Sequence, residues 1–240
     1  MSYAVLYNMF TCWMVTVLAA MALPGIFKRF PNNLGWRAYG WFWFCGACLW
    51  LLAGLRLLAY YHGLPRLDRA FFYGDEVFVA LQMEAGCVFL CDSRGASRRV
   101  TLAAAGFVAL CGLLFLIMFF SLGITATVPT EWASEHEIPR AAFLAFLPAY
   151  LFCMALMVYS VGADVWARLR TGAWADRHRL LGTGGILIYS LAGVLDVRGI
   201  LAGWHLLLIR VVYLSAVMTA FWIGRADRMR VVVVRGHEGD

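Results

Sequence analysis

Long apolar stretches constrain this chain more than any other feature of its sequence. Seven of them cover residues 3–27, 39–61, 76–91, 100–128, 141–163, 180–195 and 200–223. A helix needs about 20 apolar residues to cross the hydrocarbon core of a bilayer. Five of the stretches reach that length, and the third and sixth fall slightly short of it. We therefore predict an all-α polytopic integral membrane protein, folded as a seven-helix transmembrane bundle.

The composition excludes a soluble protein of this size. Of the 240 residues, 63% are hydrophobic and only 14% are charged, whereas soluble domains carry about 25% charged residues. We expect one transmembrane domain, residues 1–224, followed by a short cytoplasmic tail, residues 225–240. The connectors are short and contain no catalytic motif, which favours a protein that is not an enzyme.

The basic residues predict the orientation of the bundle. Connectors on the cytoplasmic side of a membrane are enriched in Lys and Arg, so the net charge of +6 needs no nucleic-acid partner. With the N-terminus outside, the inner connectors and tail hold Lys28, Arg29, Arg37, Arg94, Arg98, Arg99, Arg168, Arg170, Arg177, Arg179, Arg225, Arg228, Arg230 and Arg235. The outer connectors hold only Arg66, Arg69, Arg140 and Arg198. We predict N-out, C-in, in the inner (cytoplasmic) membrane of a bacterium.

Two charged residues lie deep inside apolar stretches, Glu84 in the third and Arg210 in the seventh. A charge in the middle of a bilayer costs roughly 2.5–3.5 kcal/mol on insertion scales, and such residues usually pair with one another or serve function. Glu84 lies roughly 13 Å along its span and Arg210 roughly 16 Å along its own, at a rise of 1.5 Å per residue. The similar depth predicts either an ion pair between the third and seventh helices or a ligand-binding site.

Further polar residues gather in the outer half of the predicted bundle. They are Arg56 and His62 of the second span, Asp196 at the end of the sixth, and His205 in the seventh. Arg56, His205 and Arg210 could together bind an anionic or polar ligand that enters from outside. His62 and His205 lie at similar depth and could be the axial ligands of a b-type haem.

A zinc site is a further alternative, because imidazole and carboxylate groups suit that ion. Its ligands would come from His62, His136 and His205 with Asp75 or Glu76. The histidines lack the close spacing of known zinc motifs, which weakens this interpretation.

The seven cysteines all lie in or at the ends of the apolar stretches. Cys45 and Cys48 form a CxxC pair, and Cys87 and Cys91 share one helix face because they are four residues apart. A redox relay or a soft-metal site is conceivable. We favour a packing role, because buried cysteine behaves as a small apolar residue and small residues let membrane helices approach closely.

These features lead to a functional hypothesis without a named substrate. We expect a non-enzymatic membrane protein, either a sensor or receptor with a polar ligand-binding pocket in its outer half, or an integral subunit of a larger membrane complex. Its partners would be the bilayer and other membrane subunits or a second copy of the chain. The alternatives are a membrane redox or metal protein carrying haem b or zinc, and a subunit of a small-anion carrier.

Overall fold

The computed structural model describes residues 3–172, 177–197 and 205–235. The elements in order are α1 (Tyr3–Arg29), α2 (Leu34–Tyr61), α3 (Pro65–Ser93), α4 (Arg98–Leu122), β1 (Ala126–Pro129), β2 (Ser134–Glu137), α5 (Arg140–Thr171), α6 (Arg177–Val197) and α7 (His205–Arg235). Helices make up nearly all of this part of the chain. The predicted all-α class is therefore confirmed.

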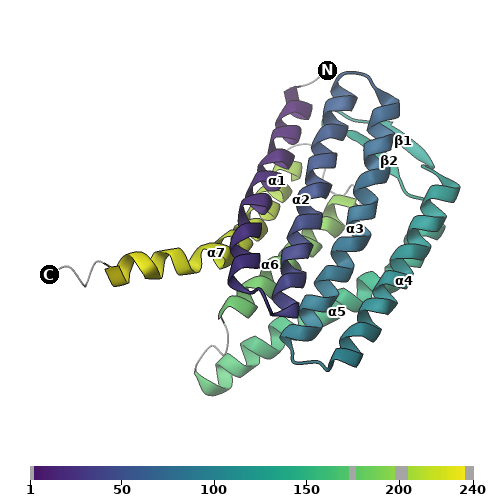
Figure 1. The fold of residues 1–240 in the computed structure, drawn as a ribbon. Coiled ribbons are helices and arrows are strands. Elements are labelled where there is room, and N and C mark those ends of the chain that lie inside the picture. Colours follow the sequence, from purple (N-terminus) through teal and green to yellow (C-terminus); the bar gives the residue numbers. More distant parts are fainter. Residues whose placement is uncertain (1–2, 173–176, 198–204, 236–240) are drawn as a thin grey trace.

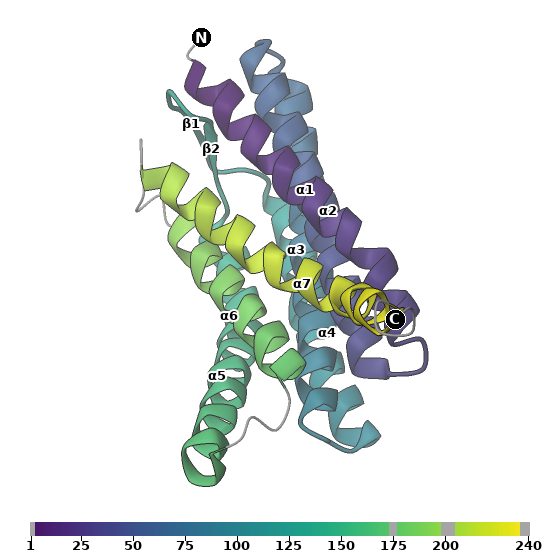
Figure 2. The ribbon, with the colours of Figure 1, turned by 90° about the vertical axis from the view of Figure 1, so that its left-hand side faces the viewer.

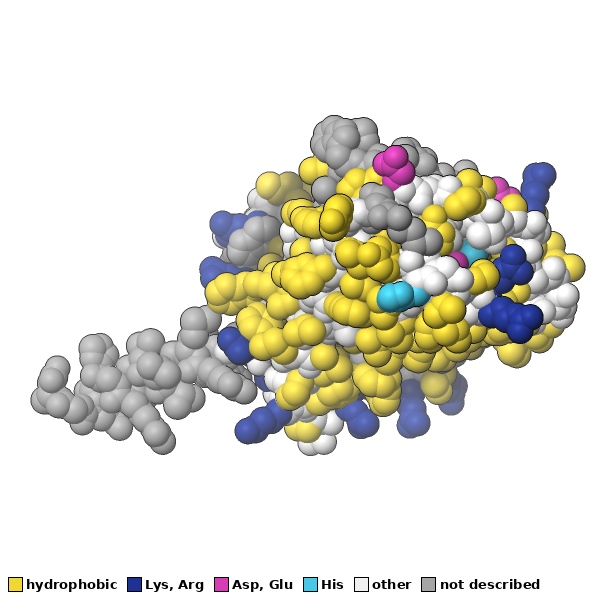
Figure 3. Space-filling model, turned by 90° about the horizontal axis from the view of Figure 1, so that it is seen from above, with side chains coloured by type: hydrophobic (Ala, Val, Ile, Leu, Met, Phe, Trp, Pro, Cys, Tyr) yellow, Lys and Arg dark blue, Asp and Glu magenta, His cyan; other side chains and the backbone are white. Residues whose placement is uncertain are grey.

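Five helices are long and apolar enough to cross a membrane. They are α1, α2, α4, α5 and, within α7, Leu208–Arg225. Large apolar side chains such as Leu110, Leu113 and Ile117 of α4 are exposed on the outside of the bundle. Viewed from the end at which the N-terminus lies, hydrophobic side chains cover much of the surface (Figure 3). Such a surface suits lipid, because soluble monomers rarely expose apolar patches beyond a few hundred Å².

The helices form a ring in which each packs on its neighbours in the sequence (Figures 1 and 2). The last helix, α7, closes the ring by packing against α1. Besides its sequence neighbours α2 and α4, α3 also contacts α5 and α6. Beyond the bundle, the C-terminal end of α7 projects away from the other helices (Figure 1). The α3 helix therefore holds a central position, with partners on several sides.

The helix α3 is longer than the apolar stretch that predicted it. Residues 76–91 were expected to be helical, but the helix runs from Pro65 to Ser93. Proline suits the first turn, because the N–H that it lacks would have no helical partner there. Asp68 and Asp75, which lie outside or at the edge of the apolar stretch, are both buried in the bundle. Hydrophobicity alone could not reveal this extension, since its buried side chains are charged.

The fourth helix ends earlier than predicted, and a hairpin follows it. The apolar stretch reaches Val128, yet α4 ends at Leu122 because Gly123 adopts a φ of 74°, which favours glycine. The next residues form β1 and β2, two antiparallel strands in which Ala126 pairs with Glu137 and Pro129 with Ser134. This β1–β2 hairpin connects α4 to α5 and lies at the same end of the bundle as the N-terminus (Figure 1).

The contact between α1 and α7 depends on two glycines. A Cβ at Gly25 would overlap the backbone of Gly224, whose Cα would be 2.8 Å away. Glycines at such crossings let membrane helices approach closely. We expect Gly25→Val to destabilise the fold by about 1–3 kcal/mol, because backbone cannot yield as a side chain can. The control is Gly106→Val in α4, where a Cβ meets open space. Equal losses in thermal unfolding of the two variants would contradict this account.

Candidate functional site

A cluster of buried charges lies where the end of α2 meets the beginning of α3. The guanidinium of Arg56 is shared between two carboxylates of α3. Its Nε lies 3.8 Å from Oδ1 of Asp68, and its Nη1 lies 3.9 Å from Oδ2 of Asp75. Only 3% of Asp68 and 6% of Asp75 are exposed. These distances give ion pairs, but they are too long for hydrogen bonds.

His136 of the hairpin completes this cluster. Its fully buried side chain places Nε2 3.1 Å from Oδ2 of Asp68. Its Nδ1 lies 3.0 Å from the hydroxyl of Thr127 on the paired strand β1. The ring of Phe72 contacts both groups, with its centre 4.8 Å from the imidazole centre and 5.2 Å from the Arg56 guanidinium carbon. We call Arg56, Asp68, Asp75 and His136 the outer cluster, after the side of the membrane on which the sequence predicts them to lie.

The outer cluster is incompletely satisfied and rich in carboxyl groups. Within the described structure, no hydrogen bond is made by Nε of Arg56, Oδ1 of Asp68, Oδ1 of Asp75 or Nε2 of His136, and all four atoms are buried. Glu76 lies within electrostatic reach of Arg56 and Asp75. Three carboxyl groups therefore lie near the guanidinium of Arg56, and one of them, that of Asp68, contacts the imidazole. Burying charge without full pairing is costly, so such a site favours the uptake of positive charge.

Three further contacts fasten the hairpin and its flank to the first three helices. Asn8 of α1 donates a hydrogen bond to the carbonyl of Trp132 at 3.3 Å. Tyr60 of α2 donates to the carbonyl of Thr130 at 2.9 Å. The N–H of Ile124 donates to the Tyr73 hydroxyl of α3 at 3.2 Å. The connection between α4 and α5 is thus held against α1, α2 and α3.

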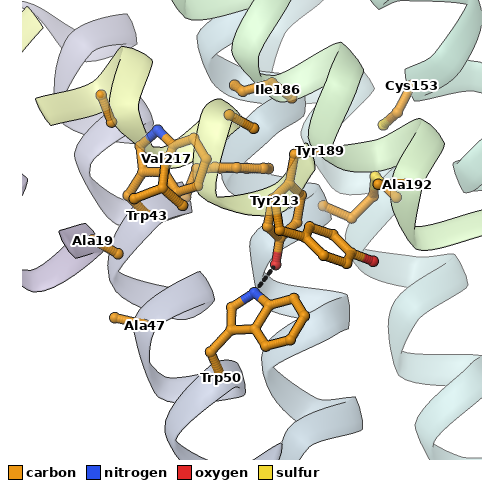
Figure 4. Packing of buried hydrophobic residues seen from close by; sticks show 14 of the residues in the cluster. Ala19, Trp43, Ala47, Trp50, Cys153, Ile186, Tyr189, Ala192, Tyr213 and Val217 are labelled. Carbon is orange, nitrogen blue, oxygen red and sulfur yellow. Dashed lines mark hydrogen bonds between the residues drawn. The ribbon is translucent and has the colours of Figure 1, made fainter. Parts of the chain in front are cut away.

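Arg210 of α7 is linked to the hairpin by hydrogen bonds that pass through Asn8 of α1. Its Nε donates to Oδ1 of Asn8 at 2.9 Å, and Asn8 in turn contacts the hairpin. The guanidinium carbon lies 4.9 Å from the ring centre of Trp50 and 5.8 Å from that of Tyr213. Trp50 donates to the Tyr189 hydroxyl at 2.9 Å (Figure 4). Arg210 is thus held by an amide and aromatic rings, which stabilise a desolvated guanidinium.

The structure does not bring Glu84 and Arg210 together. In the described part of the chain no ion pair joins them, and Glu84 has neither a hydrogen bond nor a salt bridge there. Glu84 is half-buried, with the thiols of Cys45 and Cys87 within electrostatic reach. The predicted similar depth assumed that the third helix begins near residue 76, whereas α3 begins at Pro65 and Glu84 lies correspondingly further along it.

The other predicted site residues are only partly brought together. Arg56 belongs to the outer cluster, but His62 is exposed at the end of α2, where its ring contacts Tyr61. The side chains of Asp196 and of His205, which was the second proposed haem ligand, lie outside the described part of the structure. No group of three or more His, Cys, Asp or Glu side chains that could hold a metal ion occurs among the described residues.

A second charged cluster lies at the opposite end of the bundle. Asp164 of α5 accepts from Arg179 of α6 at 2.7 Å and pairs with Arg94, after α3, at 3.0 Å. Arg179 also donates to the carbonyl of Ser93 at 3.3 Å. Only 6% of Asp164 is exposed. This inner cluster joins the ends of α3, α5 and α6.

The cysteines are all free thiols, and six of the seven are buried. Cys87 lies near Cys91 on its own helix and near Cys153 of α5. Cys48 is the half-buried one. Their positions in the apolar core fit the predicted packing role.

Sequence reasoning missed Asp68, Asn8 and Asp164 as partners of the arginines. Asn8 offered a signal, because it is an isolated amide in the first apolar stretch. His136 was considered only as a zinc ligand, and nothing in its loop indicated a hairpin that returns to α3.

No known family, curated protein or solved structure matches this chain. The site must therefore be interpreted from its own chemistry. The outer cluster contains acids, an imidazole and a guanidinium, and the hydroxyl of Thr127 lies beside the imidazole. This arrangement is able to bind charge and to hold the hairpin against the helices.

Proposed function

We propose that the chain is a non-enzymatic membrane sensor with seven spans, N-out and C-in, whose receiving element is the β1–β2 hairpin. The five strongly apolar helices and the distribution of Lys and Arg support this topology. In it, α3 and α6 also cross, with the charged flanks of α3 shielded by neighbouring helices. The hairpin then faces the outside, and the inner cluster faces the cytoplasm.

One observation carries the proposal: the polar link from the hairpin through Asn8 to Arg210. The hairpin contacts α1 through Asn8, and the same amide accepts from Arg210 of α7. A movement of the hairpin changes both hydrogen bonds of Asn8. Because α7 runs to the opposite end of the bundle, its displacement would reach the cytoplasmic side. Coupling of this kind requires an element with two arrangements that both sites bias.

Hydrogen exchange of the purified protein at fixed pH tests this coupling. Asp68→Asn weakens the attachment of the hairpin, and we expect faster exchange at residues 30–33 and 94–97 as well as in the hairpin. In an Asn8→Ala background, the change at these inner turns should disappear. Glu131→Gln, at an exposed position of the hairpin, is the matched control. Changes confined to the hairpin and the beginning of α3 would reject the sensor proposal.

A second candidate function, an integral subunit of a larger complex, is favoured by Glu84. A half-buried carboxylate that makes no hydrogen bond or ion pair with the described residues is costly inside a membrane, and a basic or hydrogen-bonding side chain from another membrane helix would stabilise it. In this case Glu84→Gln should leave the isolated chain stable but reduce the recovery of an assembly in mild detergent. If the wild type and Glu84→Gln have the same particle size in mild detergent, this alternative is rejected.

A further inference from the structure

We propose that the outer cluster is a proton-binding site and that proton uptake from the outside tightens the closure of the hairpin over the bundle. The inference rests on the sensor function proposed above and names its ligand. It starts from the four buried, unsatisfied polar atoms of Arg56, Asp68, Asp75 and His136. An imidazole contacts a carboxylate there at 3.1 Å, so nothing larger than a proton fits between them.

The surroundings of His136 can accommodate both the neutral and the protonated imidazole. In the neutral ring, a hydrogen on Nε2 is close to Oδ2 of Asp68, 3.1 Å from the nitrogen, while Nδ1 accepts from the Thr127 hydroxyl. When a proton is added at Nδ1, the hydroxyl of Thr127 rotates and accepts instead. No contact is lost, and the 3.1 Å contact with Asp68 becomes an ion pair, which makes it stronger. The proton therefore reinforces the contact that joins the hairpin to α3.

The charges around His136 also favour the uptake of a proton. Asp68 faces it from α3, Asp75 and Glu76 lie further along that helix, and Arg56 of α2 is the cation paired with Asp68 and Asp75. Three carboxylates exceed one guanidinium, so an added proton lowers their mutual repulsion wherever it binds.

The remaining neighbours of His136 add no further cation from the described elements packed against it. Thr127 of β1 and Phe72 of α3 are uncharged. The flanking Glu135 and Glu137 are acidic and exposed on the opposite face of the strand. Every charged neighbour other than Arg56 therefore attracts a proton to this site.

Opening the hairpin moves His136 away from these acids and exposes them to water. The closed form then binds protons more tightly than the open form. By linkage, the form that binds more protons gains stability as the pH falls. Acid should therefore close the hairpin, and alkaline conditions should release it.

Thermal unfolding of the full chain in detergent between pH 8 and pH 5.5 measures this effect. We expect the Tm of the wild type to rise on acidification by about 2–4 °C more than that of His136→Gln. The comparison of slopes removes the contribution of other titrating groups. His62→Gln, which removes an exposed histidine from the same end of the bundle, should keep the full slope.

A second variant keeps the test decisive if His136→Gln does not fold. Thr127→Val preserves the shape of the strand but removes the hydroxyl that accepts the Nδ1 proton, so it should also flatten the slope. Hydrogen exchange of residues 124–138 should slow on acidification in the wild type. A wild-type Tm that falls or stays level relative to the variants would overturn the proposal. Coupling to the inner turns at fixed pH would remain a separate result, so failure of the two proposals can be told apart.

Discussion

Arg56→Met should destabilise the protein by about 3–5 kcal/mol, the range measured when one member of a buried ion pair is removed. The change leaves the buried Asp68 and Asp75 without the cation that they share. Methionine retains much of the packing volume against Phe72, so the loss reports mainly on charge. Equilibrium unfolding in mixed micelles gives the free energy directly.

Two further variants locate the cause of this loss. Arg66→Met removes an exposed arginine from the same end of the bundle and should cost less than about 0.5 kcal/mol. Adding Asp75→Asn to Arg56→Met should recover part of the stability, because one unpaired charge is then removed. If the double variant is as unstable as the sum of the single variants, the two residues do not interact energetically.

Asp164→Asn should produce the second large effect, about 3 kcal/mol or more, at the inner cluster. The substitution preserves shape but leaves two guanidiniums, those of Arg94 and Arg179, near one another without their shared carboxylate. The ends of α3, α5 and α6 then lose their common contact. We expect a lower unfolding free energy and faster hydrogen exchange in the turn at residues 94–97.

The matched pair for this cluster is Arg94→Gln and Arg98→Gln, which are four residues apart. Arg94 contacts Asp164, whereas Arg98 is exposed. Only the first should be destabilising, and it should cost less than Asp164→Asn because Arg179 still satisfies the acid. A similar loss from both arginine variants would show that net charge, not the pairing with Asp164, controls stability at this end.

The membrane-spanning character could be predicted because it depends on composition and on the length of apolar stretches. The helices α1, α2, α4 and α5 each contain a stretch that was recognised. The beginning of α3 could not be found this way, because Asp68 and Asp75 reduce its hydrophobicity while their partners, Arg56 and His136, lie on other elements. Their pairing depends on which helices become neighbours in the folded protein.

The predicted partner of Arg210 shows the same limit. Counting residues along the apolar stretches gave Glu84 and Arg210 similar depths, but α3 begins at Pro65 rather than at residue 76, so the two residues do not lie equally far along their helices. Rotation about the helix axis decides which side chains meet, and the amphipathic signal of these helices is weak because lipid and core are both apolar. Asn8 of α1 accepts a hydrogen bond from Arg210 instead. The first apolar stretch contains no charged residue that would have indicated such a contact.

The closure of the ring between α1 and α7 also has a consequence for how the protein is made. Asn8 and Arg210 are 202 residues apart in the chain. At a translation rate of about 5–20 residues per second, the amide of Asn8 enters the membrane roughly 10–40 s before its arginine is synthesised. During that interval the growing bundle has an open seam along α1, and a buried polar group waits there without its final partner. The ring therefore closes only after α7 has been synthesised, and a ribosome that stalls before this helix leaves the side of α1 that packs on α7 uncovered.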